Sequence, residues 1–175
     1  GAGKSTLLYT LVGFLEPYSG DVILTLKNQP AQSVTKHPEI IKTFVGFSPQ
    51  IPAIYPKLTV KENIQHFAAL YGLRDVEITE RASTVMTFVN LQEDKDTPAQ
   101  NLSASQQKKL DIACTIIHQP TLLILDEPAA DLDPIAAEEI WKLITQIHKS
   151  GTTTVIATHL FEDVEKYCTR IAILR

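Results

Sequence analysis

Gly1-Ala-Gly-Lys-Ser-Thr6 is the stretch that decides the fold, because it matches the second half of the phosphate-binding pattern G-x-x-x-x-G-K-[ST]. Glycines in this pattern let backbone N–H groups approach phosphate oxygens, and the helix that follows presents its positive end to the anion. Apolar residues at helical spacing run from Leu7 to Leu15, and Pro17 and Gly20 end the pattern. The stretch therefore predicts a loop that enters a helix N-terminus.

The side chains of this motif indicate a site for a nucleotide and its magnesium ion. Lys4 would reach the β- and γ-phosphates, Ser5 would place its hydroxyl on Mg²⁺, and Thr6 would be a neighbouring donor to phosphate. The backbone of the three preceding residues would line the phosphates: Gly1, Ala2 and Gly3. A glycine-rich turn before an ordinary helix is the alternative, and the motifs later in the chain disfavour it.

Two adjacent acidic residues follow an uninterrupted apolar run at residues 122–125. Such a run is typical of a strand that is buried on both faces, as parallel sheets require. Asp126 is placed to hold Mg²⁺ through water, and Glu127 to take a proton from an attacking water as general base. Two neighbouring carboxylates are costly unless a cation or solvent is present. A solvated turn is the alternative, and the Lys4 motif earlier in the chain disfavours it.

Two more polar residues follow predicted strands. His159 comes after a second apolar strand, where a residue that senses the γ-phosphate would lie. Gln50 lies on a loop from which it would reach Mg²⁺ or the attacking water. Alone, either residue is an ordinary turn, core or loop side chain. The order of the motifs along the chain favours the functional interpretation.

Strands and helices alternate along the remaining sequence. We expect strands at residues 22–26, 43–47, 122–125, 153–157 and 171–174. We expect helices at residues 60–71, 76–91, 103–117, 134–150 and 161–167. This alternation predicts an α/β fold with a mostly parallel sheet flanked by helices. We expect residues 1–175 to form a single domain, with a helical subdomain at about 52–118 inserted in its core.

The helix expected at 103–117 begins with an S-x-x-Q pattern. Ser103 and Gln106 would form a capping box, in which each side chain satisfies a backbone N–H of the other. Nothing in the local sequence demands more than a capped helix.

Composition excludes several other classes of protein. The chain has 175 residues, of which 44% are hydrophobic and 21% are charged, as in ordinary globular domains. Its net charge of −4 provides no basic stripe for a phosphate backbone, so no nucleic-acid partner is expected. Its apolar runs are far shorter than the roughly 20 residues of a spanning helix. The chain itself is therefore not expected to cross a membrane.

Together these motifs resemble the nucleotide-binding domain of ABC transporters, in order and over essentially the whole chain. The resemblance rests on residues 1–6, Gln50, 102–106, 124–128, 132–133 and His159. It implies a P-loop NTPase whose helical subdomain carries a signature motif, defined here as residues 102–106. By this resemblance Gln50 is the lid-loop glutamine and His159 the switch histidine. The signature motif would contact nucleotide through Ser103, Ala104, Ser105 and Gln106.

The resemblance also implies an activity and partners. ATP and Mg²⁺ would be the cofactors, and Glu127, His159 and Gln50 would act in hydrolysis, with Ser5, Gln50 and Asp126 at the metal. Two ATP-binding domains would pair head to tail. A membrane-spanning permease domain or subunit, fused or separate, would hold them at the cytoplasmic face of a membrane. Residues 58–73 resemble the drug-, lipid- and polysaccharide-exporting branch, which implies export, and residues 50–55 would dock the membrane partner.

Departures from the family pattern leave alternatives open. Ala104 and Ser105 stand where the family has two glycines, and side chains can obstruct a backbone that must approach phosphate. Asp131 replaces a residue that is usually small. The alternatives are a soluble, non-transport ABC-type ATPase and an ATP clamp with a degenerate hydrolysis site. Because half of the first motif is absent, we also expect the sequence to be a fragment cut at both ends that binds ATP poorly alone.

Overall fold

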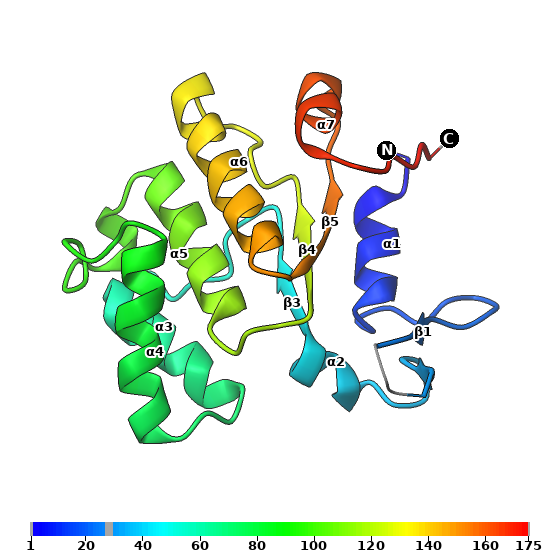
Figure 1. The fold of residues 1–175 in the computed structure, drawn as a ribbon, viewed down its shortest axis with the longest axis horizontal. Helices are drawn as coiled ribbons and strands as arrows, with labels where there is room; N and C mark the ends of the chain where they lie inside the picture. Colours follow the sequence, from blue (N-terminus) through cyan, green and yellow to red (C-terminus); the bar gives the residue numbers. More distant parts are fainter. Residues whose placement is uncertain (1, 27–29, 175) are drawn as a thin grey trace.

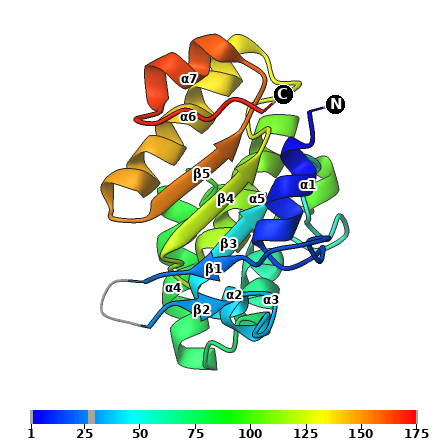
Figure 2. The ribbon, with the colours of Figure 1, turned by 90° about the vertical axis from the view of Figure 1, so that its right-hand side faces the viewer.

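A three-stranded parallel sheet forms the centre of the computed structural model, which describes residues 2–26 and 30–174. Its strands lie in the order β3 (Val45–Ser48), β4 (Leu122–Asp126) and β5 (Thr153–Ala157). Helix α1 (Lys4–Leu11) covers one face, and α5 (Ala104–Ile116) and α6 (Pro134–Lys149) cover the other (Figure 1, Figure 2). The expected α/β fold with a parallel sheet is confirmed.

Side chains of the central strand β4 alternate between the two faces, and this alternation builds two cores. Ile124 packs in a small cluster that includes Leu8 of α1. Leu123 and Leu125 belong to the larger cluster, which includes Trp141 of α6. The continuous apolar run at 122–125 thus reflects a strand that is covered on both faces.

The register of the sheet brings the carboxyl ends of its strands to one edge. Ser48 is paired with Leu125 between β3 and β4, and Asp126 with Ala157 between β4 and β5. Because all three strands run in parallel, the segments that follow them emerge side by side. This edge is the carboxyl edge in the description below.

Helices α3 (Val60–Leu70) and α4 (Asp75–Phe88) pack against each other and against α5 (Figure 1). A capping box between Thr59 and Glu62 starts α3. Asn90, at a φ of 58°, follows α4 and provides the left-handed residue that often ends a helix. The short 3₁₀ helix η1 (Ala99–Asn101) precedes α5. The limits of a helical subdomain at about 52–118 stay a prediction.

The remaining elements complete the two sides of the sheet. Strands β1 (Ile23–Leu24) and β2 (Gln32–Ser33) pair antiparallel, and α2 (Glu39–Phe44) leads into β3. Helix α7 (Phe161–Tyr167) follows β5, and Tyr167 stacks on Trp141 with ring centroids 5.0 Å apart. Within the described ranges, the helices are all too short or too polar to span a bilayer.

The predicted boundaries of two strands and of the first helix are wrong. The strand expected at 43–47 begins at Val45, because residues 39–44 form α2 behind an N-cap at Pro38. The strand expected at 22–26 is reduced to the two residues of β1. Helix α1 ends at Leu11 rather than continuing to Leu15, since Gly13 turns the chain at a φ of 75°. Local composition cannot separate a short strand from the end of a helix.

Residues 171–174 are not a strand, contrary to the prediction. Ile171, Ile173 and Leu174 are 52%, 74% and 40% exposed, and no described strand pairs with this segment. A strand needs a neighbour for its backbone N–H and C=O groups, so apolar composition alone does not make one.

Candidate functional site

The carboxyl edge of the sheet lies next to the N-terminus of α1 (Figure 2). The acidic pair of β4 and the histidine after β5 therefore approach Lys4, which is the first residue of α1. Parallel pairing places Asp126 beside Ala157, so that Glu127 and His159 leave neighbouring strand ends. Three residues far apart in the sequence thus meet at one point.

Glu127 is the centre of this group, which we call the Glu127 cluster: Lys4, Glu127 and His159. The Lys4 Nζ lies 3.7 Å from the Glu127 Oε1. The His159 Nδ1 lies 3.0 Å from Oε1 and 2.9 Å from Oε2, and its backbone N–H donates to Oε2 at 3.4 Å. The carboxylate therefore has a cation on one side and an imidazole on the other.

Glu127 has an unusual backbone as well as unusual neighbours. Its φ is 46°, in the left-handed region that non-glycine residues seldom adopt. Its N–H donates to the Ala157 carbonyl at 2.8 Å, and its own carbonyl accepts from the Ala130 N–H at 3.2 Å. These bonds hold the residue in a sharp turn directly after β4. Its side chain is only 10% exposed, compared with 63% for His159.

Asp126 lies deeper than Glu127, at 2% exposed. Its Oδ1 is buried and has no hydrogen-bond partner among the described residues. Buried polar atoms of this kind are rare and call for a missing partner, such as an ion or a water. A carboxylate oxygen is the ligand that Mg²⁺ prefers, so the residue fits the magnesium role that the sequence predicts.

The N-terminus of α1 is open to an anion. Gly3 is the N-cap residue and, lacking a side chain, leaves the first amides of the helix without a side-chain acceptor. Its φ of 81° is a conformation that glycine adopts without strain. Ala2, Gly3 and Thr6 are exposed, and Ser5 is half-buried. Gly1 lies outside the described residues.

Gln50 does not join the Glu127 cluster in this structure. It is exposed on the loop after β3, and no hydrogen bond or ion pair among the described residues links it to the cluster. Its place in catalysis or at the metal stays a prediction.

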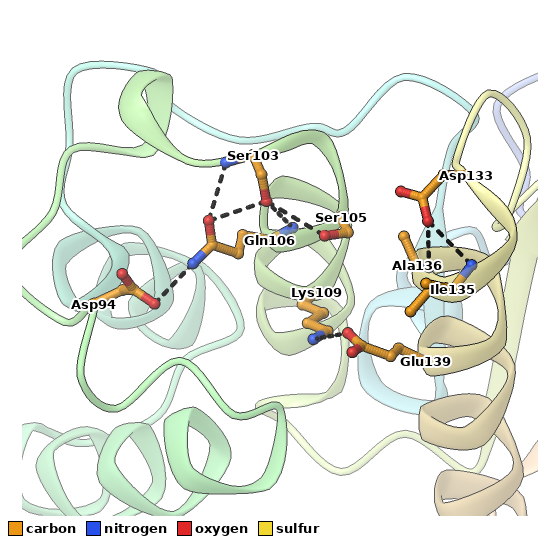
Figure 3. Close-up of polar contacts among 9 residues, drawn as sticks. All are labelled: Asp94, Ser103, Ser105, Gln106, Lys109, Asp133, Ile135, Ala136 and Glu139. Carbon is orange, nitrogen blue, oxygen red and sulfur yellow. Dashed lines mark hydrogen bonds and ion pairs between the residues drawn. The ribbon is translucent and has the colours of Figure 1, made fainter.

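The signature motif lies at the N-terminus of α5, where the expected capping box is present (Figure 3). The Ser103 N–H donates to the Gln106 Oε1 at 3.0 Å, and the Gln106 N–H donates to the Ser103 Oγ at 3.3 Å. The Ser105 Oγ lies 3.3 Å from the Ser103 Oγ, and Ala104 is exposed. No described polar contact joins this motif to the Glu127 cluster.

Helix α6 begins beside α5 and is capped independently (Figure 3). Asp133 Oδ1 accepts from the N–H groups of Ile135 and Ala136, each at 3.0 Å. An ion pair between Lys109 and Glu139, at 2.7 Å, joins the two helices. One oxygen of the Asp133 carboxylate thus caps α6.

Sequence analysis missed one polar group near the site. Ser48, Lys108 and Asp111 are each at most 4% exposed and contact one another between β3 and α5. The sequence shows charged residues at 108, 109 and 111 within the helix expected at 103–117, and nothing in their pattern separates the two buried ones from the exposed face of a capped helix.

Comparisons with known proteins identify the family of the chain. The model of the family described as ABC transporter matches residues 1–130. The Nod factor export ATP-binding protein I of Sinorhizobium fredii is 31% identical over 174 residues, which cover 99% of this chain and 49% of that protein. The linearmycin resistance ATP-binding protein LnrL of Bacillus subtilis is 32% identical, with 99% and 54% covered. The chain thus spans about half the length of these relatives.

Solved structures share the fold. The cbiO1 protein from Clostridium perfringens, described as part of the ABC transporter complex cbiONQ, superposes with a TM-score of 0.82 at 33% identity. That match covers 95% of this chain and 66% of the other. A structure described as an ATP binding subunit of an ABC transporter superposes with a TM-score of 0.76 at 26% identity, covering 95% and 68%.

Proposed function

The chain belongs to the ABC transporter family, and from this premise we propose that it binds Mg-ATP, hydrolyses it and thereby powers export through a membrane-spanning partner. The observation that carries the proposal is the convergence of Lys4 and His159 on Glu127 at the carboxyl edge of the sheet. Ligands of open α/β sheets bind outside the carboxyl ends of the strands.

Glu127 is the proposed general base. Hydrolysis requires a group that takes a proton from the attacking water, and a carboxylate next to the phosphate site can do so. His159 contacts both carboxylate oxygens and would hold the Glu127 side chain towards that water. The turn at Glu127, fixed by bonds to Ala157 and Ala130, would keep the carboxylate from rotating back over β4.

Lys4 would exchange one anion for another during the cycle. In the structure its ammonium lies 3.7 Å from Glu127, with a side chain 30% exposed. At 3.7 Å the two atoms form no hydrogen bond, so the ammonium can transfer to the β- and γ-phosphates without breaking one. Its departure would leave Glu127 paired to His159 and free to accept a proton from water.

Asp126 and Ser5 are the proposed magnesium residues. The unpartnered Asp126 Oδ1 supplies a buried carboxylate oxygen, and Ser5 lies in the first turn of α1 with a hydroxyl. When bound, Mg²⁺ would neutralise charge that develops on the transferred phosphoryl group. We propose that Gln50 approaches this ion from its loop only when nucleotide is present.

A second ATP-binding domain would complete the site. The signature motif has no described polar contact with the Glu127 cluster of its own chain, which supports its use on the nucleotide of a partner domain. There the N-terminus of α5 would face the γ-phosphate from the side opposite to α1, and both helix dipoles favour an anion. We propose a head-to-tail dimer with ATP between the two chains.

Export by a membrane partner is the proposed use of this cycle. One relative is named for Nod factor export and another for linearmycin resistance, and both names describe ATP-binding proteins. The export name favours a transport subunit over a soluble ATPase of another kind. We propose that this subunit lies at the cytoplasmic face of a membrane. The membrane-spanning domain or subunit would convert closure of the ATP-bound dimer into movement of cargo.

The test compares ATP hydrolysis by the full-length natural protein with that of Glu127→Gln, each with and without Mg²⁺. We expect Mg²⁺-dependent turnover that falls at least about 100-fold in the variant, the usual contribution of a general base, with ATP binding retained. Glu138→Gln is the matched control, because Glu138 is an exposed carboxylate on α6 that pairs with Lys142.

Two other results would change the proposal. Turnover that survives Glu127→Gln would show that the base lies elsewhere. ATP binding without turnover in the natural protein would support the second candidate, an ATP clamp. The observation that favours the clamp is Ser105, whose hydroxyl lies 3.3 Å from the Ser103 hydroxyl at the N-terminus of α5, where a glycine would leave the amides clear.

A further inference from the structure

A buried polar network joins the end of β3 to α5, and nothing in the proposed chemistry uses it. Its members are Ser48, Lys108 and Asp111, which are 0%, 4% and 2% exposed. The Lys108 Nζ donates to the Ser48 Oγ at 3.1 Å, and the Ser48 hydroxyl donates to the Asp111 Oδ2. The Lys108 Nζ also lies 3.6 Å from that Oδ2, so each of the three residues contacts the other two.

The same two charged side chains hold the loop that carries Gln50 at both of its ends. The Lys108 Nζ donates to the Pro49 carbonyl at 2.6 Å, just before Gln50. The Asp111 Oδ1 accepts from the Ala53 N–H at 2.9 Å, three residues after it. Between these two attachments Gln50 is exposed, and Ile51 is 82% exposed. The loop is therefore attached to α5 on both sides of Gln50 and is exposed between the two attachments.

Stability does not explain this arrangement. Burial lowers the pKa of Lys108 and raises the pKa of Asp111, so the loss of water acts against both charges despite their pairing. Apolar side chains of similar volume in such a place are commonly as stable or more stable. Lys108 and Asp111 make directed hydrogen bonds to the backbone on either side of Gln50, which apolar residues cannot make.

The helix that holds the loop also carries the signature motif. Ser103 caps α5, and Lys108 and Asp111 follow on its next two turns. Burial lowers the pKa of Lys108, and the negative charge of Asp126 opposes that shift. One helix is thus connected both to the Gln50 loop and to the surface that would meet a partner domain.

We propose that Lys108 and Asp111 are positioning residues that fasten the Gln50 loop to α5, so that Gln50 and the signature motif move as one body when nucleotide binds. The inference rests on the proposed function for its role in the cycle. The attachment itself does not depend on ATP.

The attachment is tested by hydrogen exchange on the full-length protein without nucleotide. Lys108→Met removes the hydrogen bond to the Pro49 carbonyl and leaves Asp111, the acceptor of the Ala53 amide, without its cation. We expect the exchange rate of the Ala53 amide to rise about tenfold, the change that follows when one net hydrogen bond no longer opposes local opening of the loop. Lys109→Met is the matched control, since the neighbouring Lys109 pairs with Glu139 on α6 and not with the loop. Unchanged exchange at Ala53 in Lys108→Met would overturn the proposal.

A buried Asp111 without its cation can prevent folding, so a second variant keeps the experiment decisive. Lys108→Met/Asp111→Leu removes both charges and both attachments while keeping side chains of similar length and branching. We expect it to fold and to show exchange at Ala53 at least as fast as in Lys108→Met, because it also removes the acceptor of that amide. Native-like protection of that amide in the folded double variant would equally contradict the proposal.

The role in the cycle is tested by kcat in a double-mutant cycle. We expect Gln50→Ala and Lys108→Met each to lower kcat, and their combination to lower it no further than Gln50→Ala alone, because Lys108 acts through Gln50. Effects that multiply would show that Lys108 acts independently, and would refute the positioning role. If the natural protein has no Mg²⁺-dependent turnover, the proposed function fails, while exchange at Ala53 still decides whether the loop is attached.

Discussion

Gly46→Ala should destabilise the protein although its backbone suits alanine. Gly46 lies in β3 and is buried against α5. A Cβ at this position would lie 2.7 Å from the Thr115 carbonyl oxygen, 2.8 Å from the Thr115 Cγ2 and 3.2 Å from the Pro120 Cγ. The first contact is with backbone, so it is relieved only if β3 and α5 move apart.

The size of the effect follows from two opposing terms. Overpacking of a filled core costs about 1–3 kcal/mol. Replacing glycine in a strand recovers about 0.5–1 kcal/mol, because the unfolded chain loses freedom. The central values of the two terms leave a net destabilisation of about 1 kcal/mol, which lowers the urea midpoint by roughly 0.5 M at an m-value of about 2 kcal/mol/M.

Urea unfolding, followed by the fluorescence of the buried Trp141, measures the change. Thr115→Ser is the rescuing partner, because it removes the Cγ2 contact, leaves the carbonyl contact and keeps the hydroxyl bond to the Asp111 carbonyl. The double variant should recover part of the lost stability and not all of it. A Gly46→Ala midpoint equal to that of the natural protein would refute the reasoning that β3 and α5 are in close backbone contact.

Two further predictions concern a histidine and a helix cap. His118 stacks on Tyr71 with ring centroids 3.7 Å apart, and burial lowers its pKa from 6.5 to about 4. The unfolded chain therefore binds the proton more tightly than the folded chain does. The stability that is present above pH 6.5 should be lost as the pH falls towards 4. Melting temperatures across this range should fall less steeply in His118→Phe than in the natural protein, and equal slopes would contradict the assignment. Asp133→Ala should lower the free energy of unfolding by about 1 kcal/mol, measured by thermal unfolding, because both capping hydrogen bonds of α6 are lost. Asp133→Asn, which keeps an acceptor, should cost much less, and equal losses would show that the cap is not the cause.

Much of the fold was predictable because the deciding signals are local. Helices at 60–71, 103–117, 134–150 and 161–167 were predicted to within a residue or two. The capping box at Ser103 and the cap at Asp133 act within a single turn, so their sequence patterns suffice to recognise them. The apolar run that ends in Asp126 likewise indicates a buried strand whatever lies beside it.

The failures share a physical cause. Residues 43–44 and 171–174 have the composition of strands, yet the former end a helix and the latter lie exposed without a partner. Strand formation depends on pairing with a second segment, and a single stretch of sequence does not contain that information. The short strand β2 was missed for the same reason.

The sequence by itself determined the motifs, their order and therefore the family and the parallel α/β fold. Tertiary structure alone decided which side chains meet. Parallel register brings Glu127 and His159 to adjacent strand ends, where they contact each other. Lys4, at the N-terminus of α1, contacts the same glutamate. Gln50 stays apart from this group. The burial of Lys108 and Asp111 also appeared only when α5 docked on β3, because the environment of a charge is set by segments distant in sequence.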